Sequence, residues 1–264
     1  KLGGIIEIYE KFTGEDPRKV PMKIFPAVHY SMGGMWVDYN QMTNIPGLFA
    51  AGECDYSQHG ANRLGANSLL SAIYGGMVAG PKALEYINGL KQTTDSLSST
   101  LFDSAAKQQQ EKYDNILKMD GTENAYVIHR ELGEWMTDNV TVVRYNDRLQ
   151  KTDEKIQELM ERYKRININD TNRWSNSGAS FTRHLWNMLV LSRVITLGAL
   201  QRDESRGAHY KPEFPERNDE QFMKTTMAKY NAETTAPEIY YEDVDVSLIP
   251  PRKRDYSQNK KGGE

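Results

Sequence analysis

The sequence predicts a mixed, mainly α fold in which a strand–loop–helix segment leads into an antiparallel helical bundle and a small irregular terminal module. A short apolar run at 48–51 precedes a glycine-rich loop at 60–67, which is typical of a buried strand followed by a loop close to a ligand. No proline occurs between Pro81 and Pro212, so helices can run uninterrupted there. Prolines return after Pro212, which predicts irregular structure near the C-terminus.

The strand–loop–helix segment is the most informative part of the chain. Gly52 and Glu53 follow the strand at its carboxyl end, where a carboxylate can accept hydrogen bonds from a ribose. The loop at 60–67 is built from small residues around Arg63, its only fixed charge. Asn67 or Ser68 can cap the next helix, whose free N–H groups and positive dipole end would then face the same pocket. The pattern therefore predicts an anion site.

Small residues recur along the helix that follows the loop. Ala72, Gly76 and Gly80 are spaced four residues apart, with Gly75 and Ala79 beside them. We expect this smooth face to pack tightly against a sheet or another helix. Without that partner, the helix should expose a patch that needs covering.

The proline-free stretch predicts helices at about 100–118, 123–138, 146–166 and 182–205, and the spacing of its apolar residues indicates a bundle. In the third helix the apolar stripe is Leu149, Ile156, Leu159, Tyr163 and Ile166. In the last it is Leu185, Met188, Leu189, Ser192, Ile195 and Ala199.

The remainder of the chain predicts a helix near 5–10 and an edge strand at 239–246. A basic tail contains Arg252, Lys253, Arg254, Lys260 and Lys261. It is either a solvated terminus or a segment that docks to a partner or an anionic membrane surface.

Composition excludes several classes of function. The net charge of −3 gives no electrostatic footprint for nucleic acid. Cys54 is the single cysteine, so neither an internal disulfide nor a cysteine-ligated iron–sulfur cluster can form within the chain, and we expect it to be a small buried side chain. His129, His184 and His209 lack metal-ligand spacing, so no metal site is predicted. No apolar run approaches the ~20 residues that span a bilayer.

Three motifs resemble one family. His29–Gly34 (HYSMGG), Ala51–Glu53 (AGE) and His59–Leu70 (HGANRLGANSLL) are similar to the succinate dehydrogenase/fumarate reductase flavoprotein subunit of the bacterial type. Arg202–His209 and the segment at 249–256 resemble its carboxyl-terminal part, so the resemblance covers nearly the whole chain. It implies that 1–28 ends a substrate-capping domain and that 29–92 is the carboxyl-terminal segment of an FAD-binding domain. It places the bundle at 93–206 and the terminal module at 207–264.

The resemblance also implies a site. His29 and Arg63 would bind a dicarboxylate, Glu53 would bind the FAD ribose, and the backbone of Ser68 and Leu69 would face the flavin pyrimidine. His59 would either orient the loop or contact the substrate. The string Arg206–His209 would mainly link the last bundle helix to the terminal module by hydrogen bonds, with a direct active-site role as the alternative.

Other family features are absent from this sequence. No GxGxxG turn for the FAD pyrophosphate occurs, and the arginine that transfers the proton is expected upstream, so no catalytic residue is assigned. Together with a start at Lys1 in place of methionine, this predicts a carboxyl-terminal fragment; an intact small protein that shares the site is the alternative.

The implied reaction is oxidation of succinate to fumarate, with a hydride passing to FAD. Electrons would go to an iron–sulfur subunit and, through a membrane-anchor cytochrome b subunit, to quinone. The protein would lie peripherally on the cytoplasmic face of the bacterial membrane. Three alternatives are open: fumarate reductase, the more distant L-aspartate oxidase, and an inactive folded fragment that only docks to partners.

Overall fold

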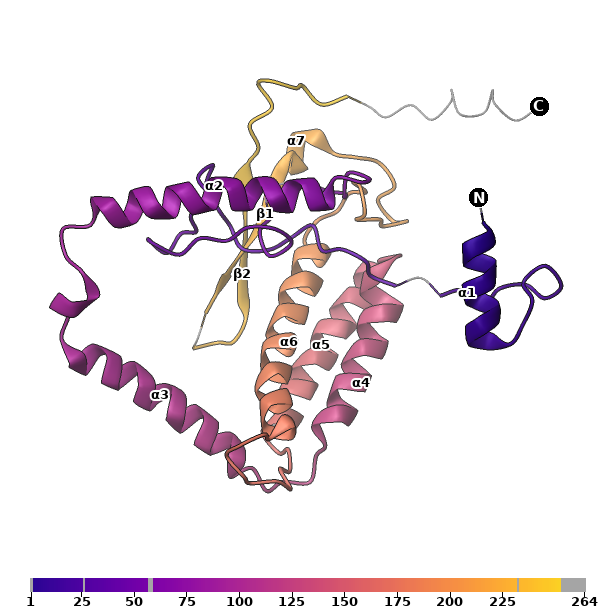
Figure 1. The fold of residues 1–264 in the computed structure, drawn as a ribbon. Helices are drawn as coiled ribbons and strands as arrows, with labels where there is room; N and C mark the ends of the chain where they lie inside the picture. The colour runs from indigo at the N-terminus through magenta and orange to yellow at the C-terminus, as the bar shows by residue number, and fades with distance from the viewer. Residues whose placement is uncertain (1, 26, 57–58, 232, 253–264) are drawn as a thin grey trace. The chain divides into compact units, whose positions relative to one another are not determined.

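The computed structural model describes residues 2–25, 27–56, 59–231 and 233–252 (Figure 1). The chain divides into two compact units, Lys1–Ser31 and Met32–Glu264. The second unit has the mainly α architecture that the sequence predicts. Lys253, Arg254, Lys260 and Lys261 of the basic tail lie outside the described residues.

The first unit is built around α1, Gly3–Thr13. Gly14 ends the helix with φ +72°, and its N–H donates to the carbonyl of Glu10 at 2.8 Å, which satisfies one of the last helical carbonyls. The Lys23 N–H donates to the Tyr9 hydroxyl at 3.0 Å, so the segment after the helix is held against it.

The second unit begins with irregular backbone. The strand predicted at 48–51 is reduced to an isolated antiparallel bridge between Met42 and Phe49. A second isolated bridge, parallel, joins Met35 to Asp55. A strand needs a neighbour along its whole length, and within the described residues this segment pairs at single positions only.

The helix α2, Ser68–Gly89, begins where the sequence predicts, and it packs through Gly75. A side-chain carbon at Gly75 would lie 3.0 Å from Gln41 Oε1 and 3.2 Å from Ala51 Cβ. Nothing lies within 4 Å of the same position at Gly76 or Gly80, so this part of the small-residue face is uncovered within the described residues. The expected uncovered apolar patch is present and consists of Leu69, Leu70, Ile73, Tyr74, Met77, Leu84 and Ile87.

After a short 3₁₀ turn, Thr94–Ser96, α3 spans Ser99–Leu117. Residues 99–112 are exposed throughout, and only the last turn packs, through Ile116 and Leu117 against Ala179. Figure 1 shows that α3 reaches the bundle at one end. Its C-terminal end therefore packs on the bundle, and the rest of the helix extends away from it.

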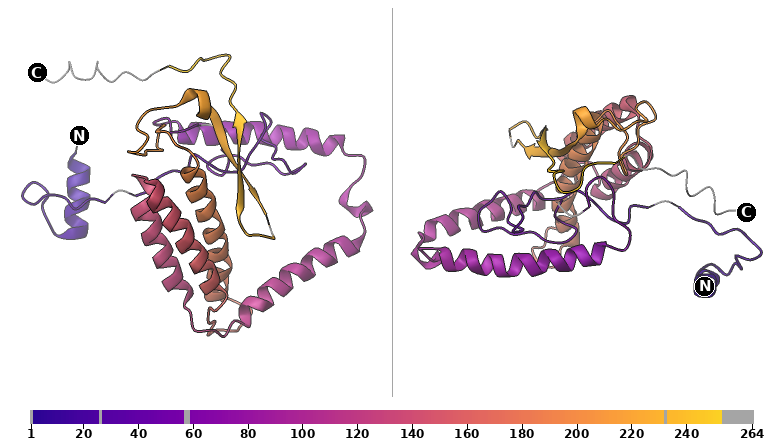
Figure 2. Two further views of the ribbon diagram at one scale, coloured as in Figure 1. Left: turned by 180° about the vertical axis from the view of Figure 1, so that it is seen from behind. Right: turned by 90° about the horizontal axis from the view of Figure 1, so that it is seen from above.

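Three helices form the bundle: α4 (Ala125–Met136), α5 (Asn146–Tyr163) and α6 (Ser177–Leu200), with a π turn at Thr137–Thr141 between the first two. Figures 1 and 2 show these helices lying side by side. The buried core is Ala125, Ile128, Leu132, Ile156, Leu159, Met160, Ile166, Leu185 and Leu189. The predicted stripe of α6 is wrong at one position, because Ile195 is 49% exposed.

The bounds of α6 differ from the predicted 182–205. The side chain of Asn176 accepts a hydrogen bond from the Ala179 N–H at 2.8 Å, which starts the helix earlier. At the other end Lys211, fully buried, donates from Nζ to the Leu200 carbonyl at 3.0 Å and to Asp203 Oδ1 at 2.9 Å. The Lys211 ammonium group thus satisfies the carbonyl of the last helical residue, Leu200, and interacts favourably with the helix dipole.

The terminal part contains α7, Asp219–Phe222, and an antiparallel ribbon of β1, Lys224–Tyr230, and β2, Pro237–Asp243. The ribbon packs along α6 (Figure 2). The predicted strand at 239–246 is thus shifted toward the N-terminus, and its partner β1 was not predicted. No helix in the described part of the chain is long and apolar enough to cross a membrane.

Candidate functional site

The loop at 59–67 turns sharply at two positions. Gly60 has φ +60°, and Ala66 has φ +59°, a left-handed conformation that costs free energy for a residue with a side chain. The N–H of Asn67 donates to the Leu64 carbonyl at 3.1 Å, which closes the turn before α2. Arg63 is half-buried between these two positions.

His59 joins the two ends of this loop. Its side chain is 9% exposed, and Nε2 lies 3.3 Å from Ser71 Oγ in α2. That hydroxyl also donates to the Ser68 carbonyl at 2.9 Å. The geometry is that of a residue that orients the loop, one of the two roles that the sequence left open for His59.

The first turn of α2 directly follows the loop. Asn67 occupies the N-cap position, but its side chain makes no capping hydrogen bond. The N–H groups of the first helical turn have no acceptor within the helix and therefore suit an external acceptor or anion. Ser68 Oγ is buried and has no hydrogen-bond partner among the described residues, and Leu69 beside it is 79% exposed. This turn could hold a ligand with hydrogen-bond acceptors and an apolar face.

The Gly52–Glu53 turn lies against α2. Gly52 has φ +88°, and a side-chain carbon there would lie 3.6 Å from Ala72 Cβ. Glu53 is exposed. Cys54 is also exposed, with Sγ 3.3 Å from the Ala51 carbonyl, so the prediction of a buried cysteine is wrong. The backbone of this turn contacts a neighbouring segment of the chain.

That neighbouring segment contains the second glycine of the HYSMGG motif. A side-chain carbon at Gly34 would collide with the carbonyl oxygen of Cys54 and lie 2.7 Å from its carbonyl carbon. The Met35 N–H donates to the same oxygen at 2.7 Å. Gly34 therefore allows two backbones to approach, whereas Gly33 has open space.

The structure thus brings together Arg63, Ser68 and Leu69 on one loop and helix, with the Glu53 turn against the same helix. His29 is exposed and belongs to the first compact unit.

The Arg206–His209 string packs against the loop, a contact that sequence reasoning missed. The Ala208 N–H donates to the Ala61 carbonyl at 2.9 Å. The sequence singled out the Arg206–His209 string but could not indicate this contact, because Ala61 and Ala208 are far apart in the chain. The predicted link to the terminal module is also present, because Arg206 binds Glu204 at 2.8 Å and Asp219 at 2.6 Å.

His209 is neutral in this arrangement. Arg144 can only donate, so Nδ1 accepts its hydrogen bond at 2.6 Å, and Nε2 donates to the Arg202 carbonyl at 2.8 Å. Burial, followed by the nearby charge of Arg144, lowers the pKa of His209 to about 4.

Comparison with known proteins shows the family to which the chain belongs. The model of the fumarate reductase flavoprotein C-terminal family matches residues 129–256, and the FAD binding domain model matches residues 1–69. The succinate dehydrogenase flavoprotein subunit of Bacillus subtilis is 74% identical over 260 residues, covering 98% of this chain. The chain belongs to the succinate dehydrogenase/fumarate reductase flavoprotein family. It spans 44% of the length of that relative.

Other members of the flavoprotein family are more distant. The fumarate reductase flavoprotein subunit of Haemophilus influenzae is 38% identical, over 97% of this chain and 42% of its own. Among solved structures, a chain of Escherichia coli quinol fumarate reductase has a TM-score of 0.88 and 35% identity, over 96% of this chain and 43% of that one.

Proposed function

We propose that this chain forms part of the flavoprotein subunit of a succinate dehydrogenase, which binds FAD and oxidises succinate to fumarate. The observation that carries the proposal is the loop with Arg63, which runs directly into the open first turn of α2. The family's FAD binding domain model ends at residue 69, in the same turn. The 74% identity to the Bacillus subtilis subunit supports it along nearly the whole chain.

Arg63 and His29 are the proposed substrate ligands. A four-carbon dicarboxylate carries two negative charges, and a pocket poor in water must satisfy both ends. The guanidinium of Arg63 can bind one carboxylate through two parallel hydrogen bonds. His29 can donate to the other carboxylate. Hydrogen bonds to a carboxylate would restrict the orientation of the substrate.

Glu53, Ser68 and Leu69 are the proposed FAD ligands. When bound, FAD supplies the acceptor for the hydride that leaves the substrate. The N–H groups at Ser68 and Leu69 would donate to the flavin pyrimidine and favour added negative charge there. The buried Ser68 Oγ fits the same role, because a ligand would give it the partner that the described residues do not. Glu53 would accept hydrogen bonds from the ribose.

The domain assignment is part of the same proposal. Residues 1–28 would end the substrate-capping domain, 29–92 would complete the FAD-binding domain, 93–206 would form the bundle and 207–264 the terminal module. The exposed apolar patch on α2 supports the second of these, because a helix with that face needs a covering domain.

We further propose an assembly. Electrons would pass to an iron–sulfur subunit and then, through a membrane-anchor cytochrome b subunit, to quinone. The flavoprotein would be peripheral, on the cytoplasmic face of the bacterial membrane. Flavoprotein subunits of succinate dehydrogenase and of quinol fumarate reductase among its relatives support these partners.

Fumarate reductase is the second candidate, because several of the relatives carry that name. It is the same chemistry run in reverse. The higher identity to a succinate dehydrogenase subunit, 74% against 38%, favours succinate oxidation.

Arg63→Ala in the full-length subunit, assembled with its partners, tests the function. We expect dicarboxylate binding to disappear while bound flavin, measured by its absorbance, stays unchanged. Arg130→Ala, which removes an exposed arginine from α4, is the matched control and should leave both intact. Succinate affinity that survives in Arg63→Ala would contradict the assignment.

A further inference from the structure

The Arg206–His209 segment is a tight turn with a defined backbone. The Arg206 N–H donates to the His209 carbonyl at 2.8 Å, and the His209 N–H donates back to the Arg206 carbonyl at 3.0 Å. Gly207 has φ +60°, a conformation that glycine adopts without steric cost. The turn therefore presents Gly207 and Ala208 at its tip.

The tip of this turn touches the loop two residues before Arg63. Besides the hydrogen bond from the Ala208 N–H to the Ala61 carbonyl, a side-chain carbon at Gly207 would collide with that carbonyl oxygen. The same atom would lie 2.6 Å from the carbonyl carbon of Ala61 and 2.9 Å from its Cβ. The obstacle is mostly backbone, so a side chain at Gly207 can be accommodated only if the turn or the loop moves.

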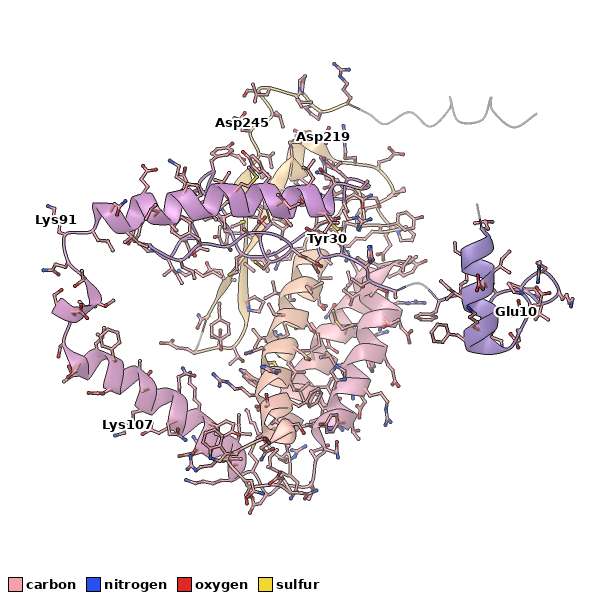
Figure 3. All side chains as sticks on the ribbon, viewed as in Figure 1. Glu10, Tyr30, Lys91, Lys107, Asp219 and Asp245 are labelled. Atoms are coloured by element: carbon pink, nitrogen blue, oxygen red, sulfur yellow. The ribbon has the colours of Figure 1, made fainter. Side chains whose placement is uncertain are left out.

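The base of the turn is held by hydrogen bonds and ion pairs on several sides, so displacement of the turn itself is costly. Arg206 donates to both carboxylate oxygens of Glu204, at 2.8 and 3.0 Å, and Glu204 is fully buried. Arg206 also binds Asp219, labelled in Figure 3, and His209 is fixed by Arg144 and the Arg202 carbonyl. Charged groups buried in mutual contact resist displacement because leaving the network strands a charge.

We infer that Gly207 and Ala208 are positioning residues for substrate binding. Their turn contacts the Ala61 carbonyl and thereby fixes the position of the loop that carries Arg63. The inference rests on the proposed function of Arg63 as a dicarboxylate ligand. The turn does not touch substrate; it acts through the backbone of the loop. A small error in the position of a bidentate ligand weakens binding strongly, because both hydrogen bonds depend on one geometry.

Gly207→Ala in the full-length flavoprotein, assembled with its partners, is the direct test. The variant should push the loop away and raise KM for succinate about tenfold or more, since a misplacement of 1 Å costs up to about a hundredfold. The dissociation constant of malonate, a dicarboxylate that cannot be oxidised in this way, should rise by a similar factor. Flavin content should stay close to that of the unchanged protein, and the fall in Tm from the backbone strain should be too small to account for the rise in KM.

Gly14→Ala is the matched control. Gly14 also has a positive φ, +72°, but nothing lies within 4 Å of the added carbon, so this variant carries the backbone strain without the collision. We expect its KM and malonate affinity to be unchanged. A second variant, Ala208→Pro, removes the N–H that binds Ala61 and should weaken malonate binding in the same direction.

Two outcomes would overturn the inference. In the first, Gly207→Ala retains its KM and malonate affinity. In the second, these change only in proportion to a loss of flavin and a fall in Tm, which would make the turn merely structural. Arg63→Ala separates the inference from the proposed function: if that variant also keeps its malonate affinity, the function itself is wrong. If Arg63→Ala loses binding while Gly207→Ala does not, only the positioning role of the turn is wrong.

Discussion

Asp153 of α5 and Arg193 of α6 form a buried ion pair with two hydrogen bonds. Arg193 Nε lies 2.7 Å from Asp153 Oδ1, and Nη2 lies 3.0 Å from Oδ2. The two side chains are 12% and 8% exposed, respectively. Burial of both charges is costly and is offset only while each has its partner. The pair therefore holds α5 and α6 together through the penalty of separating it.

Removal of one partner should destabilise the bundle. We expect Arg193→Met to lower the free energy of unfolding of the chain by about 3–5 kcal/mol, because Asp153 would be left as an uncompensated buried charge. Lys151→Met, which removes the exposed pair with Asp147, is the control and should cost at most about 0.5 kcal/mol. Urea unfolding followed by circular dichroism measures both. An equal decrease in the free energy of unfolding in both variants would show that the buried pair stabilises the fold no more than the exposed pair does.

Glu131 should make stability depend on pH in the acid range. Hydrogen bonds from Arg162, at 2.7 and 3.0 Å, lower its pKa from 4.5 to about 2. The stabilisation is therefore complete above pH 4.5 and is lost as the pH falls toward 2. The stability difference between the unchanged chain and Glu131→Gln should shrink over that window. Glu154→Gln, at an exposed position of α5, should show no such trend; a constant difference for Glu131→Gln would refute the prediction.

His209 should make stability depend on pH at higher pH than Glu131 does, because burial lowers its pKa. Its pKa falls from 6.5 in the unfolded chain to about 4 in the fold, so the folded state disfavours the proton. Its stabilisation is complete above pH 6.5 and decreases as the pH falls to 4. In His209→Gln, whose amide does not titrate, this part of the pH dependence should disappear from the unfolding free energy. An imidazole that titrates near pH 6.5 by NMR would contradict the prediction.

Glu53→Ala should weaken FAD retention in the full-length subunit without preventing folding. Glu53 is exposed on its turn, so its loss removes the proposed ribose acceptor and leaves the core untouched. Flavin content after dialysis, read from absorbance, measures the effect. Glu134→Ala, at an exposed position of α4, serves as the control. If both variants keep the same amount of flavin, Glu53 is not a ligand.

The local parts of this fold could be predicted from sequence. The glycine-rich loop, the start of α2 and the helices of the bundle follow from short-range patterns, and α3 begins within a residue of its predicted position. The errors arose where distant residues decide. The end of α6 at Leu200 involves a hydrogen bond from Lys211, which is distant in sequence. The residues of β1 lack the alternation of apolar side chains that predicts a strand, and they form one through pairing with β2.

The contacts of the candidate site also fall into those that could be predicted from the sequence and those that could not. Arg63, Ser68 and Leu69 are neighbours in sequence, so their association could be predicted from one motif. The contact of Gly207 with Ala61 could not, because no periodicity links a turn near the C-terminus to a loop near the start of the second unit. Only the backbone path in three dimensions brings them together.

The hydrogen bond between Ala208 and Ala61 also imposes an order on biosynthesis. The loop that presents Arg63 leaves the ribosome long before the turn that holds it. At about 5–20 residues per second the delay is on the order of ten seconds. During that interval the nascent chain carries the arginine loop without the turn that contacts it, so this long-range hydrogen bond is among the contacts that can form only late in synthesis.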